Sequence, residues 1–447
     1  MSFTLRTTVM HTPTPNHLEV LDDAVVTVDD SGVITAVESA SSEAGVQLLA
    51  SASTLINTPA DSVLLPGLID LHVHAPQWPQ LGTGLDMPLE RWLFEYTFPL
   101  EARYTDLTFA RSVWDDLVGT LLRHGTTTAV YFATTDVAAT TALAHAALQA
   151  GQRAYVGRVA MDHPEGTPEW YRDPSSGAGV SASSASIEEI NALDAGRGLV
   201  RPIITPRFTP ACTDALLQGL GELALATNTL VQTHCSESDW AHGYALERFG
   251  VTDTAALERF GLLRPGTVLA HSNHVTDDDA SLISHSHAGI AHCPLSNAYF
   301  ANAVLPVRHL VDRAVRIGLG TDIAGGASPS LLGQCHDAVT VSRLLNDGVD
   351  RRRPPIERGA AGSAIDTTFA FWLATVGGAS VLGAPIGLIA TGLRFDAVLV
   401  DTASHRGSLR VWPEVDSAER IFEKIVRLAG PADIEAVWVD GRPTLRP

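Results

Sequence analysis

The sequence predicts an α/β protein: a (β/α)8 barrel of the TIM type with a small β-sandwich domain formed by both chain termini. Two observations lead to this fold. Apolar, β-branched runs alternate with helical stretches through the middle of the chain, which is typical of a parallel sheet. Short strand-like pieces separated by turns occupy both ends of the chain. About eight strand–helix units over ~320 residues favour a closed barrel over an open sheet.

The barrel strands are predicted from their apolar and β-branched residues. We expect the barrel to span residues 66–392 of the 447-residue chain. The stretch 174–186 (PSSGAGVSASSAS) is predicted to be a loop, because its residues are small and mostly polar. The predicted strand runs lie at 64–71, 126–131, 153–157, 201–205, 230–233, 268–270, 289–291 and 316–320.

The two chain ends are predicted to pair as one small β domain. This domain takes in residues 1–65 together with residues 393–447, on either side of the barrel. A turn at residues 29–32 separates two β-rich pieces at hairpin distance. The strand pieces lie at 3–7, 24–28, 33–37, 396–400 and 436–439.

Composition excludes several classes of partner. The net charge is −20, with 30 basic residues against 50 acidic ones, so the chain lacks the basic face that binds nucleic acid or an anionic membrane surface. The triplet Arg351–Arg353 lies beside two prolines and is expected to be a solvated loop. Charged residues make up only 18% of the chain, below the usual ~25%, and we expect a homodimer that buries extra apolar surface.

The sequence also favours a cytoplasmic enzyme. It has no signal-peptide pattern at the N-terminus and no apolar run of the ~18 residues that a membrane span needs. Its four cysteines show no C-x-x-C spacing, so neither a disulfide scaffold nor a structural zinc knuckle is expected.

Five of the eight predicted strand ends carry a side chain of the metal-binding or catalytic kind. Barrels of this class place their working residues at that edge. His72 and His74 stand at i and i+2 on an extended strand, so both imidazoles face one side and can reach one metal. His234, His271 and Asp322 follow later strands. Imidazoles with a carboxylate suit Zn²⁺, which can lower the pKa of a bound water to ~7.

Two further residues bear on the chemistry. Glu237 follows His234 by three residues, and a carboxylate there could carry a proton without being locked to the metal. The single lysine, Lys424, lies far too late in the chain to be carbamylated at the end of the fourth strand and bridge two metals. Arg207 stands near that place instead, and a guanidinium with a pKa above ~12 does not bind metal. We therefore expect one metal, and an Arg207 free to bind a carbonyl oxygen of a substrate.

In these motifs the sequence resembles the amidohydrolase superfamily, in its mononuclear deaminase branch. The superfamily resemblance rests on PGLIDLHVH (66–74), HCSE (234–237), AHS (270–272) and GTD (320–322). A longer set of motifs is very similar to guanine deaminases and spans about residues 60 to 405. It comprises HVHAPQW (72–78), GTGLDMPLERWL (82–93), YTFPLE (96–101), HGTTT (124–128), TPRF (205–208) and GLGTDIAGG (318–326).

The resemblance implies a role for each matching residue. It implies one zinc per chain, with iron as the alternative metal, held by His72, His74, His234 and Asp322. Glu237 would be the proton shuttle, His271 would contact the metal-bound water or the substrate, and Asp322 would help to deprotonate the water. The implied reaction is the hydrolysis of guanine to xanthine and ammonia. The implied purine-binding residues are Gln77, Arg207 and Phe208, with Trp78 as a second stacking surface.

The same resemblance leaves alternatives open. Residues 272–275 (SNHV) and Leu295 depart from the pattern usual in guanine deaminases. Another aminated heterocycle, such as a pterin, an oxidised guanine or a triazine, is therefore an alternative substrate. Hydrolysis of a C–Cl or amide bond is another alternative, as is a barrel that acts only as a binding scaffold. Trp92 is expected to pack in the core. Four other histidines are expected to lie outside the chemistry: His274, His285, His287 and His292.

Overall fold

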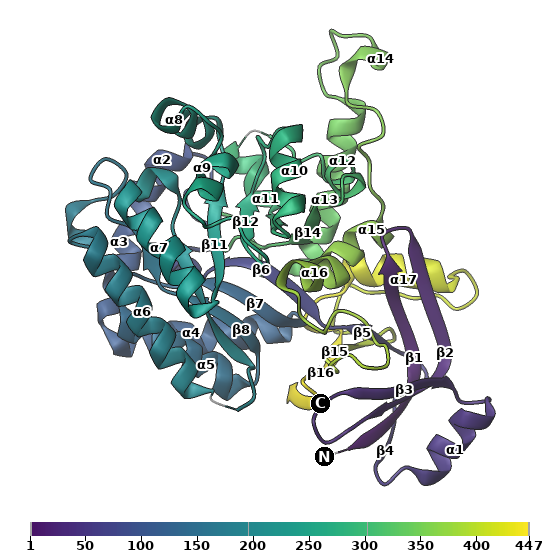
Figure 1. The fold of residues 1–447 in the computed structure, drawn as a ribbon. Helices are drawn as coiled ribbons and strands as arrows, with labels where there is room; N and C mark the ends of the chain where they lie inside the picture. The colour runs from purple at the N-terminus through teal and green to yellow at the C-terminus, as the bar shows by residue number, and fades with distance from the viewer. Residues whose placement is uncertain (1, 195, 302, 446–447) are drawn as a thin grey trace.

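A computed structural model describes residues 2–194, 196–301 and 303–445. Its centre is a parallel sheet that curls into a nearly closed barrel (Figure 1). The barrel strands follow one another around the sheet in chain order, and each predicted run overlaps one of them. They are β6 (Leu68–His74), β7 (Thr126–Phe132), β8 (Arg153–Gly157), β10 (Val200–Pro206), β11 (Leu230–Cys235), β12 (Val268–His271), β13 (Gly289–His292) and β14 (Arg316–Leu319), with the short β9 (Val159–Ala160) beside β10.

The first and last strands meet just beyond their ends. The Asp322 N–H donates to the His72 carbonyl at 2.8 Å, and the His74 N–H donates to the Ile323 carbonyl at 2.9 Å. Two hydrogen bonds therefore join β6 to the segment after β14. The predicted (β/α)8 barrel is confirmed.

Helices cover the outside of the barrel, and several start at side-chain caps. Asp106 accepts from the N–H groups of Thr108 and Phe109 and so begins α4, whose buried face recurs every three or four residues. The covering helices are α4 (Leu107–Arg123), α5 (Val137–Ala150), α6 (Ser176–Leu193), α7 (Asp214–Thr227), α8 (Asp239–Phe249), α9 (Asp253–Arg259), α10 (Asp277–His285), α12 (Val307–Asp312), α13 (Leu331–Asp347), α15 (Thr367–Trp372) and α16 (Gly378–Leu382).

Short helical turns fill the loops between these elements. Those near the ends of the barrel strands are η1 (Ala75–Gln80), α2 (Leu89–Trp92), η2 (Leu93–Thr97), α3 (Phe98–Glu101), η3 (Ala102–Thr105), η4 (Glu169–Tyr171), η5 (Thr209–Ala211), α11 (Pro294–Ser296) and η6 (Asn297–Ala301). Helix η7 (Leu373–Gly377) links α15 to α16. Figure 1 shows α14 (Pro355–Arg358) on an arm that projects from the barrel. The arm includes the exposed Arg351–Arg353 triplet, as expected of a solvated loop.

The prediction of a loop at 174–186 is wrong, because most of this stretch belongs to α6. The Ser175 side chain accepts from the Ala178 N–H and begins the helix. Small residues then lie on the buried side: Gly179 has no room for a Cβ beside Asp173 and Leu216, and Ser183 satisfies its own hydroxyl on the Gly179 carbonyl at 2.8 Å. The serine and glycine content reflects close packing of a helix.

Both chain ends contribute to one mixed sheet of eight strands (Figure 1). Strand β5 pairs parallel with β1 and antiparallel with β15, which joins the two ends of the chain. The strands are β1 (Phe3–Thr14), β2 (His17–Val28), β3 (Ile34–Ser39), β4 (Leu55–Asn57), β5 (Ser62–Pro66), β15 (Ala397–Asp401), β16 (Ile434–Val439) and β17 (Arg442–Leu445), with helices α1 (Glu43–Ser51) and α17 (Ala418–Leu428). The predicted pairing of the termini is confirmed, whereas the domain limits at 65 and 393 stay a prediction.

A buried ion pair fastens this sheet to the barrel. Arg153, the first residue of β8, binds both carboxylate oxygens of Asp396 at 2.9 and 3.0 Å. The Asp440 N–H donates to the same carboxylate.

No helix among the described residues is long and apolar enough to cross a membrane.

Candidate active site

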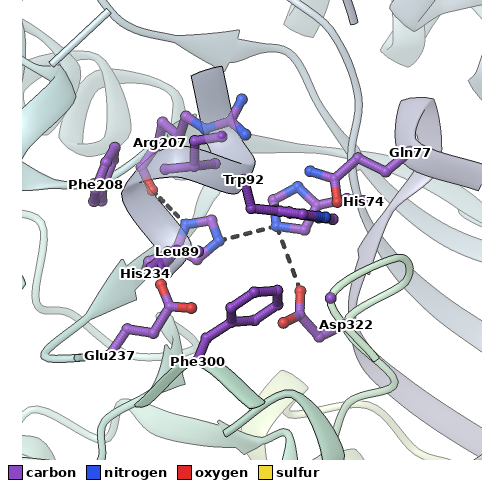
Figure 2. Close-up of a pocket in the computed structure, with 12 residues that line it drawn as sticks. His74, Gln77, Leu89, Trp92, Arg207, Phe208, His234, Glu237, Phe300 and Asp322 are labelled. Atoms are coloured by element: carbon purple, nitrogen blue, oxygen red, sulfur yellow. Dashed lines mark hydrogen bonds and ion pairs between the residues drawn. The ribbon is translucent and has the colours of Figure 1, made fainter. Parts of the chain in front are cut away.

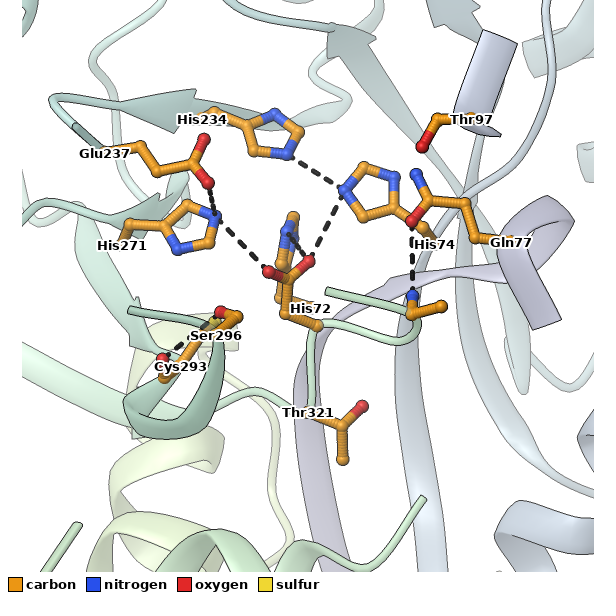
Figure 3. A network of polar contacts seen from close by, with 12 residues as sticks. His72, His74, Gln77, Thr97, His234, Glu237, His271, Cys293, Ser296 and Thr321 are labelled. Atoms are coloured by element: carbon orange, nitrogen blue, oxygen red, sulfur yellow. Dashed lines mark hydrogen bonds and ion pairs between the residues drawn. The ribbon is translucent and has the colours of Figure 1, made fainter. Parts of the chain in front are cut away.

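Five predicted side chains converge at the carboxyl ends of the barrel strands (Figure 3). His72 and His74 come from the end of β6, His234 from β11 and His271 from β12, and Asp322 follows β14. The Nε2 atoms of His74 and His234 lie 2.9 Å apart. The Asp322 carboxylate lies 3.2 Å from His72 Nε2 and 3.6 Å from His74 Nε2. These atoms come from strands spread around the barrel and meet at one point.

The donor set fits a metal ion. Burial lowers the pKa of His72, His74 and His234 well below the ordinary histidine value, so all three imidazoles are neutral and carry a free lone pair. His72 Nε2 and His271 Nε2 are buried and make no hydrogen bond within the described residues. A cation beside His72 Nε2 would satisfy that nitrogen, and neutral imidazoles with a carboxylate are a common ligand set for a divalent metal.

Neighbouring acceptors fix how two of these imidazoles present their nitrogens. His234 Nδ1 lies 2.6 Å from the Arg207 carbonyl, so Nδ1 carries the proton and Nε2 is left as the ligand atom. His271 Nδ1 lies 2.9 Å from Asn297 Oδ1, and by the same argument its Nε2 faces the cluster as a lone pair. The protein thus sets both tautomers from outside the cluster.

Glu237 lies beside the cluster with its carboxyl 3.7 Å from His271 Nε2. Burial, together with the nearby Asp322 carboxylate, raises the pKa of Glu237 to about 8. A carboxyl with such a pKa can both accept and release a proton near neutral pH. In the described part of the chain, no hydrogen bond ties this carboxyl to another side chain.

A chain of amides holds the loop that carries Glu237. The Asn273 side chain donates to the Glu237 carbonyl at 2.8 Å, and its own oxygen accepts from the Asn297 side chain at 2.8 Å. Asn297 in turn accepts from His271. Asn273 belongs to the 272–275 segment that departs from the usual guanine deaminase pattern, and in this chain it links Glu237 to His271.

A buried aspartate supports the same loop from the other side. The Asp253 carboxylate accepts from the Ser236 N–H at 2.8 Å and from the Thr209 hydroxyl at 2.6 Å. Ser236 has a positive φ of 45°, an uncommon backbone state for a residue with a Cβ. Asp253 therefore holds the sharp turn that aims Glu237 at the cluster.

A cavity opens onto this cluster and is lined by both polar and aromatic side chains. Figure 2 shows the side chains around it. Gln77, Arg207 and Phe208, all predicted to bind substrate, line it together with Glu237. Its lining residues are His74, Gln77, Leu89, Trp92, Leu93, Arg207, Phe208, His234, Glu237, Phe300, Asp322 and Gly325.

Trp78 lies apart from the cavity lining. Its indole N–H donates to Asp116 on α4 at 2.7 Å, which directs the ring to the helix layer. Trp92, expected in the core, is buried as predicted, and one of its faces also lines the cavity. Its ring lies 5.2 Å from that of Phe300. Sequence reasoning missed this second role, since a buried aromatic gives the same signal whether it packs in a core or lines a pocket.

Glu101 is a site residue that sequence reasoning did not single out. Its buried carboxylate accepts from Arg207 at 2.6 and 3.2 Å and from the Gln77 amide at 3.0 Å. The only signal for it was its place at the end of the YTFPLE motif. It contacts two of the predicted substrate-binding residues.

The remaining flagged residues lie outside the cluster. His285 and His287 are exposed. His274 is half-buried and stacks on His242 at 5.4 Å. His292 is buried, and burial lowers its pKa to about 3. The backbone N–H of Leu295 lies 3.4 Å from the Gln334 side-chain oxygen.

Comparisons with known proteins agree with this architecture. A profile of the amidohydrolase family matches residues 63–444. The probable guanine deaminase of Schizosaccharomyces pombe is 36% identical over 97% of this chain and 82% of its own length. The guanine deaminase of Dictyostelium discoideum is 33% identical over 97% of this chain and 96% of its own length.

A solved structure extends the agreement to the fold. The crystal structure of guanine deaminase from C. acetobutylicum, with guanine bound in its active site, superposes with a TM-score of 0.87 at 27% identity. The match covers 99% of this chain and all of the other. A family profile that matches most of the sequence, two relatives matched over nearly its whole length and a shared fold all agree: this chain belongs to the amidohydrolase family.

Proposed function

We propose that this protein is a zinc-dependent deaminase that hydrolyses guanine to xanthine and ammonia. One observation carries the proposal. A single cavity is lined by side chains of the cluster that could hold a metal ion, by Glu237, and by Arg207 and Gln77. The relatives that match this chain over nearly its whole length are named guanine deaminases, which supports guanine as the substrate.

In this proposal His72, His74, His234 and Asp322 hold the metal. Three neutral imidazole nitrogens and one carboxylate favour zinc, and iron is the alternative. When bound, the ion would act as a Lewis acid and lower the pKa of a water that it binds. His271 Nε2, which lies 3.8 Å from the Asp322 carboxylate, is placed to orient that water.

Glu237 supplies the proton transfers. Its carboxylate takes a proton from the attacking water, delivers it to a ring nitrogen of guanine, and assists protonation of the amine at C2 as it leaves. The raised pKa of Glu237 supports both roles, because a general acid–base group works best when its pKa lies near the working pH. Water adds to C2, the exocyclic C2–N bond breaks as the remaining hydroxyl proton on the C2 oxygen passes by way of Glu237 to the leaving amine, and the products are xanthine and ammonia.

Arg207, Gln77 and Phe208 recognise the base in this proposal. Guanine presents O6 and N7 as acceptors, which suit an arginine fork. The Gln77 amide can donate to a ring nitrogen. Phe208 offers a flat face for stacking, and the cavity is also lined by Trp92 and Phe300.

A homodimer, a cytoplasmic location and a place in purine breakdown stay predictions from the sequence.

The proposal predicts that guanine is the preferred substrate. Zinc-loaded protein should release ammonia from guanine at a higher kcat/KM than from a pterin, 8-oxoguanine or an aminotriazine, because Arg207 and Gln77 match the O6 edge of guanine. Ammonia release across these compounds measures the preference. Turnover of a pterin or triazine with none of guanine would contradict the substrate assignment, and no turnover of any compound would favour a binding scaffold.

Glu237→Gln should retain the metal and the fold but lower kcat by ~10²-fold or more, since the amide cannot carry the proton. Metal content and kcat are measured on the same preparation. Glu247→Gln, at an exposed glutamate on α8, is the matched control and should turn over like the wild type. A Glu237→Gln enzyme with near-normal kcat would remove Glu237 from the proton transfers.

Asn273→Ala should lower kcat about tenfold while the metal stays bound. The substitution removes the two hydrogen bonds by which the Asn273 side chain connects Glu237 to Asn297. A buried polar group left without a hydrogen-bond partner costs about 1–3 kcal/mol. His274→Ala, next to Asn273 but 22% exposed and outside the cavity lining, should have little effect. Equal kcat for Asn273→Ala and wild type would show that the amide chain does not position Glu237.

A further inference from the structure

The wall of the cavity contains a buried ion pair between Arg207 and Glu101. The two side chains are 2% and 0% exposed, and the closest nitrogen–oxygen distance is 2.6 Å. A guanidinium removed from water is stable only beside an opposite charge and good hydrogen bonds. Arg207 has five N–H donors, and Glu101 engages two of its nitrogens, which leaves others for a substrate.

Glu101 also fixes the second recognition residue. The Gln77 amide nitrogen donates to Glu101 Oε1 at 3.0 Å, and the Gln77 oxygen accepts from the Ala324 N–H at 3.2 Å. The nitrogen and the oxygen of the Gln77 side-chain amide each have a hydrogen-bond partner. Exchanging their positions by rotation of the amide group would break both hydrogen bonds. The Phe98 ring packs against the Arg207 guanidinium at 5.0 Å. One carboxylate thus sets the positions of two side chains that line the cavity.

The pair has an electrostatic consequence. An unpaired arginine in a buried wall would attract an anionic ligand strongly, because charges interact more strongly away from water. Glu101 cancels that charge where the substrate binds. Three acidic residues, Asp86, Glu90 and Asp239, also line a neighbouring cavity that shares Leu89 and Phe300 with the first. A negatively charged heterocycle therefore meets no free positive side chain in this wall.

We propose that Glu101 is a positioning residue that holds Arg207 and Gln77 in place and, by neutralising Arg207, restricts the cavity to uncharged heterocycles. This inference rests on the function proposed above and narrows its substrate class. It favours neutral bases such as guanine over carboxylated pterins or other anionic rings, even where the ring itself would fit.

The test compares a neutral ligand with an anionic one of nearly the same shape. Nicotinamide and nicotinate are smaller than guanine and differ by one charge at neutral pH. Their dissociation constants are measured by calorimetry on zinc-loaded wild type, Glu101→Gln, Arg207→Gln and the double variant. All four proteins contain the same metal. A change in the ratio of the two dissociation constants therefore measures the effect of the charges on Arg207 and Glu101.

The charge role predicts that, of the two single variants, only Glu101→Gln shifts the ratio towards nicotinate. Glu101→Gln leaves Arg207 unpaired and should shift the ratio about tenfold or more towards nicotinate. Arg207→Gln should shift it the other way or leave it unchanged, and the double variant should return to the wild-type ratio. The charge role is overturned if the ratio in Glu101→Gln equals that of the wild type. It is also overturned if a preference for nicotinate persists in the double variant or appears in Arg207→Gln. The Arg207→Gln arm is informative even if Glu101→Gln fails to fold.

Glu101→Asp tests the positioning role separately. This variant keeps the charge but shortens the side chain, so it should raise the KM for guanine about tenfold, change kcat little and leave the nicotinamide–nicotinate ratio as in wild type. A wild-type KM overturns the positioning role. If the wild type itself releases no ammonia from guanine, the proposed function fails, while the ratio still decides whether Glu101 sets the charge preference.

Discussion

The junction between β6 and β14 is the constraint on which the site depends, because it brings the first and last barrel strands together. Asp70 on β6 accepts from the Thr321 hydroxyl at 2.6 Å and from the Thr321 N–H at 2.9 Å. The next residue, Asp322, donates its N–H to the His72 carbonyl. Burial raises the pKa of Asp70 to about 7, while the bonds from Thr321 oppose that rise. Without this junction, Asp322 would not reach the imidazoles of His72 and His74.

The strand ends also bend the backbone sharply at the places where chemistry is expected. Ser236, His271 and Asp322 all have positive φ values, of 45°, 68° and 50°, in a region that residues with a Cβ rarely occupy. Such states persist where surrounding bonds hold them, and they cluster at functional sites. Here the Ser236 N–H donates to the Asp253 carboxylate, and the Asp322 N–H donates to the His72 carbonyl on β6. The site is thus built on rigid strand ends and fixed by groups just outside it.

The sequence was sufficient to predict the barrel, the pairing of the chain termini and the convergence of the cluster. The reason is that each of these depends on a regular pattern: alternating strand and helix runs, and polar residues just after strands. His72 and His74 on one strand face the same side whatever the details of the loops.

What the sequence could not supply depends on contacts between distant segments. Glu101 matters because α3 brings it to Arg207, 106 residues later in the chain, and no local pattern encodes that distance. From the sequence we expect Trp78 to stack on the substrate and Trp92 to pack in the core, yet it is Trp92 that lines the cavity, while Trp78 donates to Asp116. The Ser- and Gly-rich composition of α6 suggested a loop because propensity ignores the close packing that selects small residues.

We propose that residues from β6, β11 and the end of β14 hold one metal ion. Crystals of the zinc-loaded protein can be tested with an anomalous-difference map recorded at the zinc absorption edge. We expect a single strong peak within about 2.0–2.3 Å of the Nε2 atoms of His72, His74 and His234 and of an Asp322 oxygen. A map with no peak among these four side chains, from protein that releases ammonia from guanine, would contradict it.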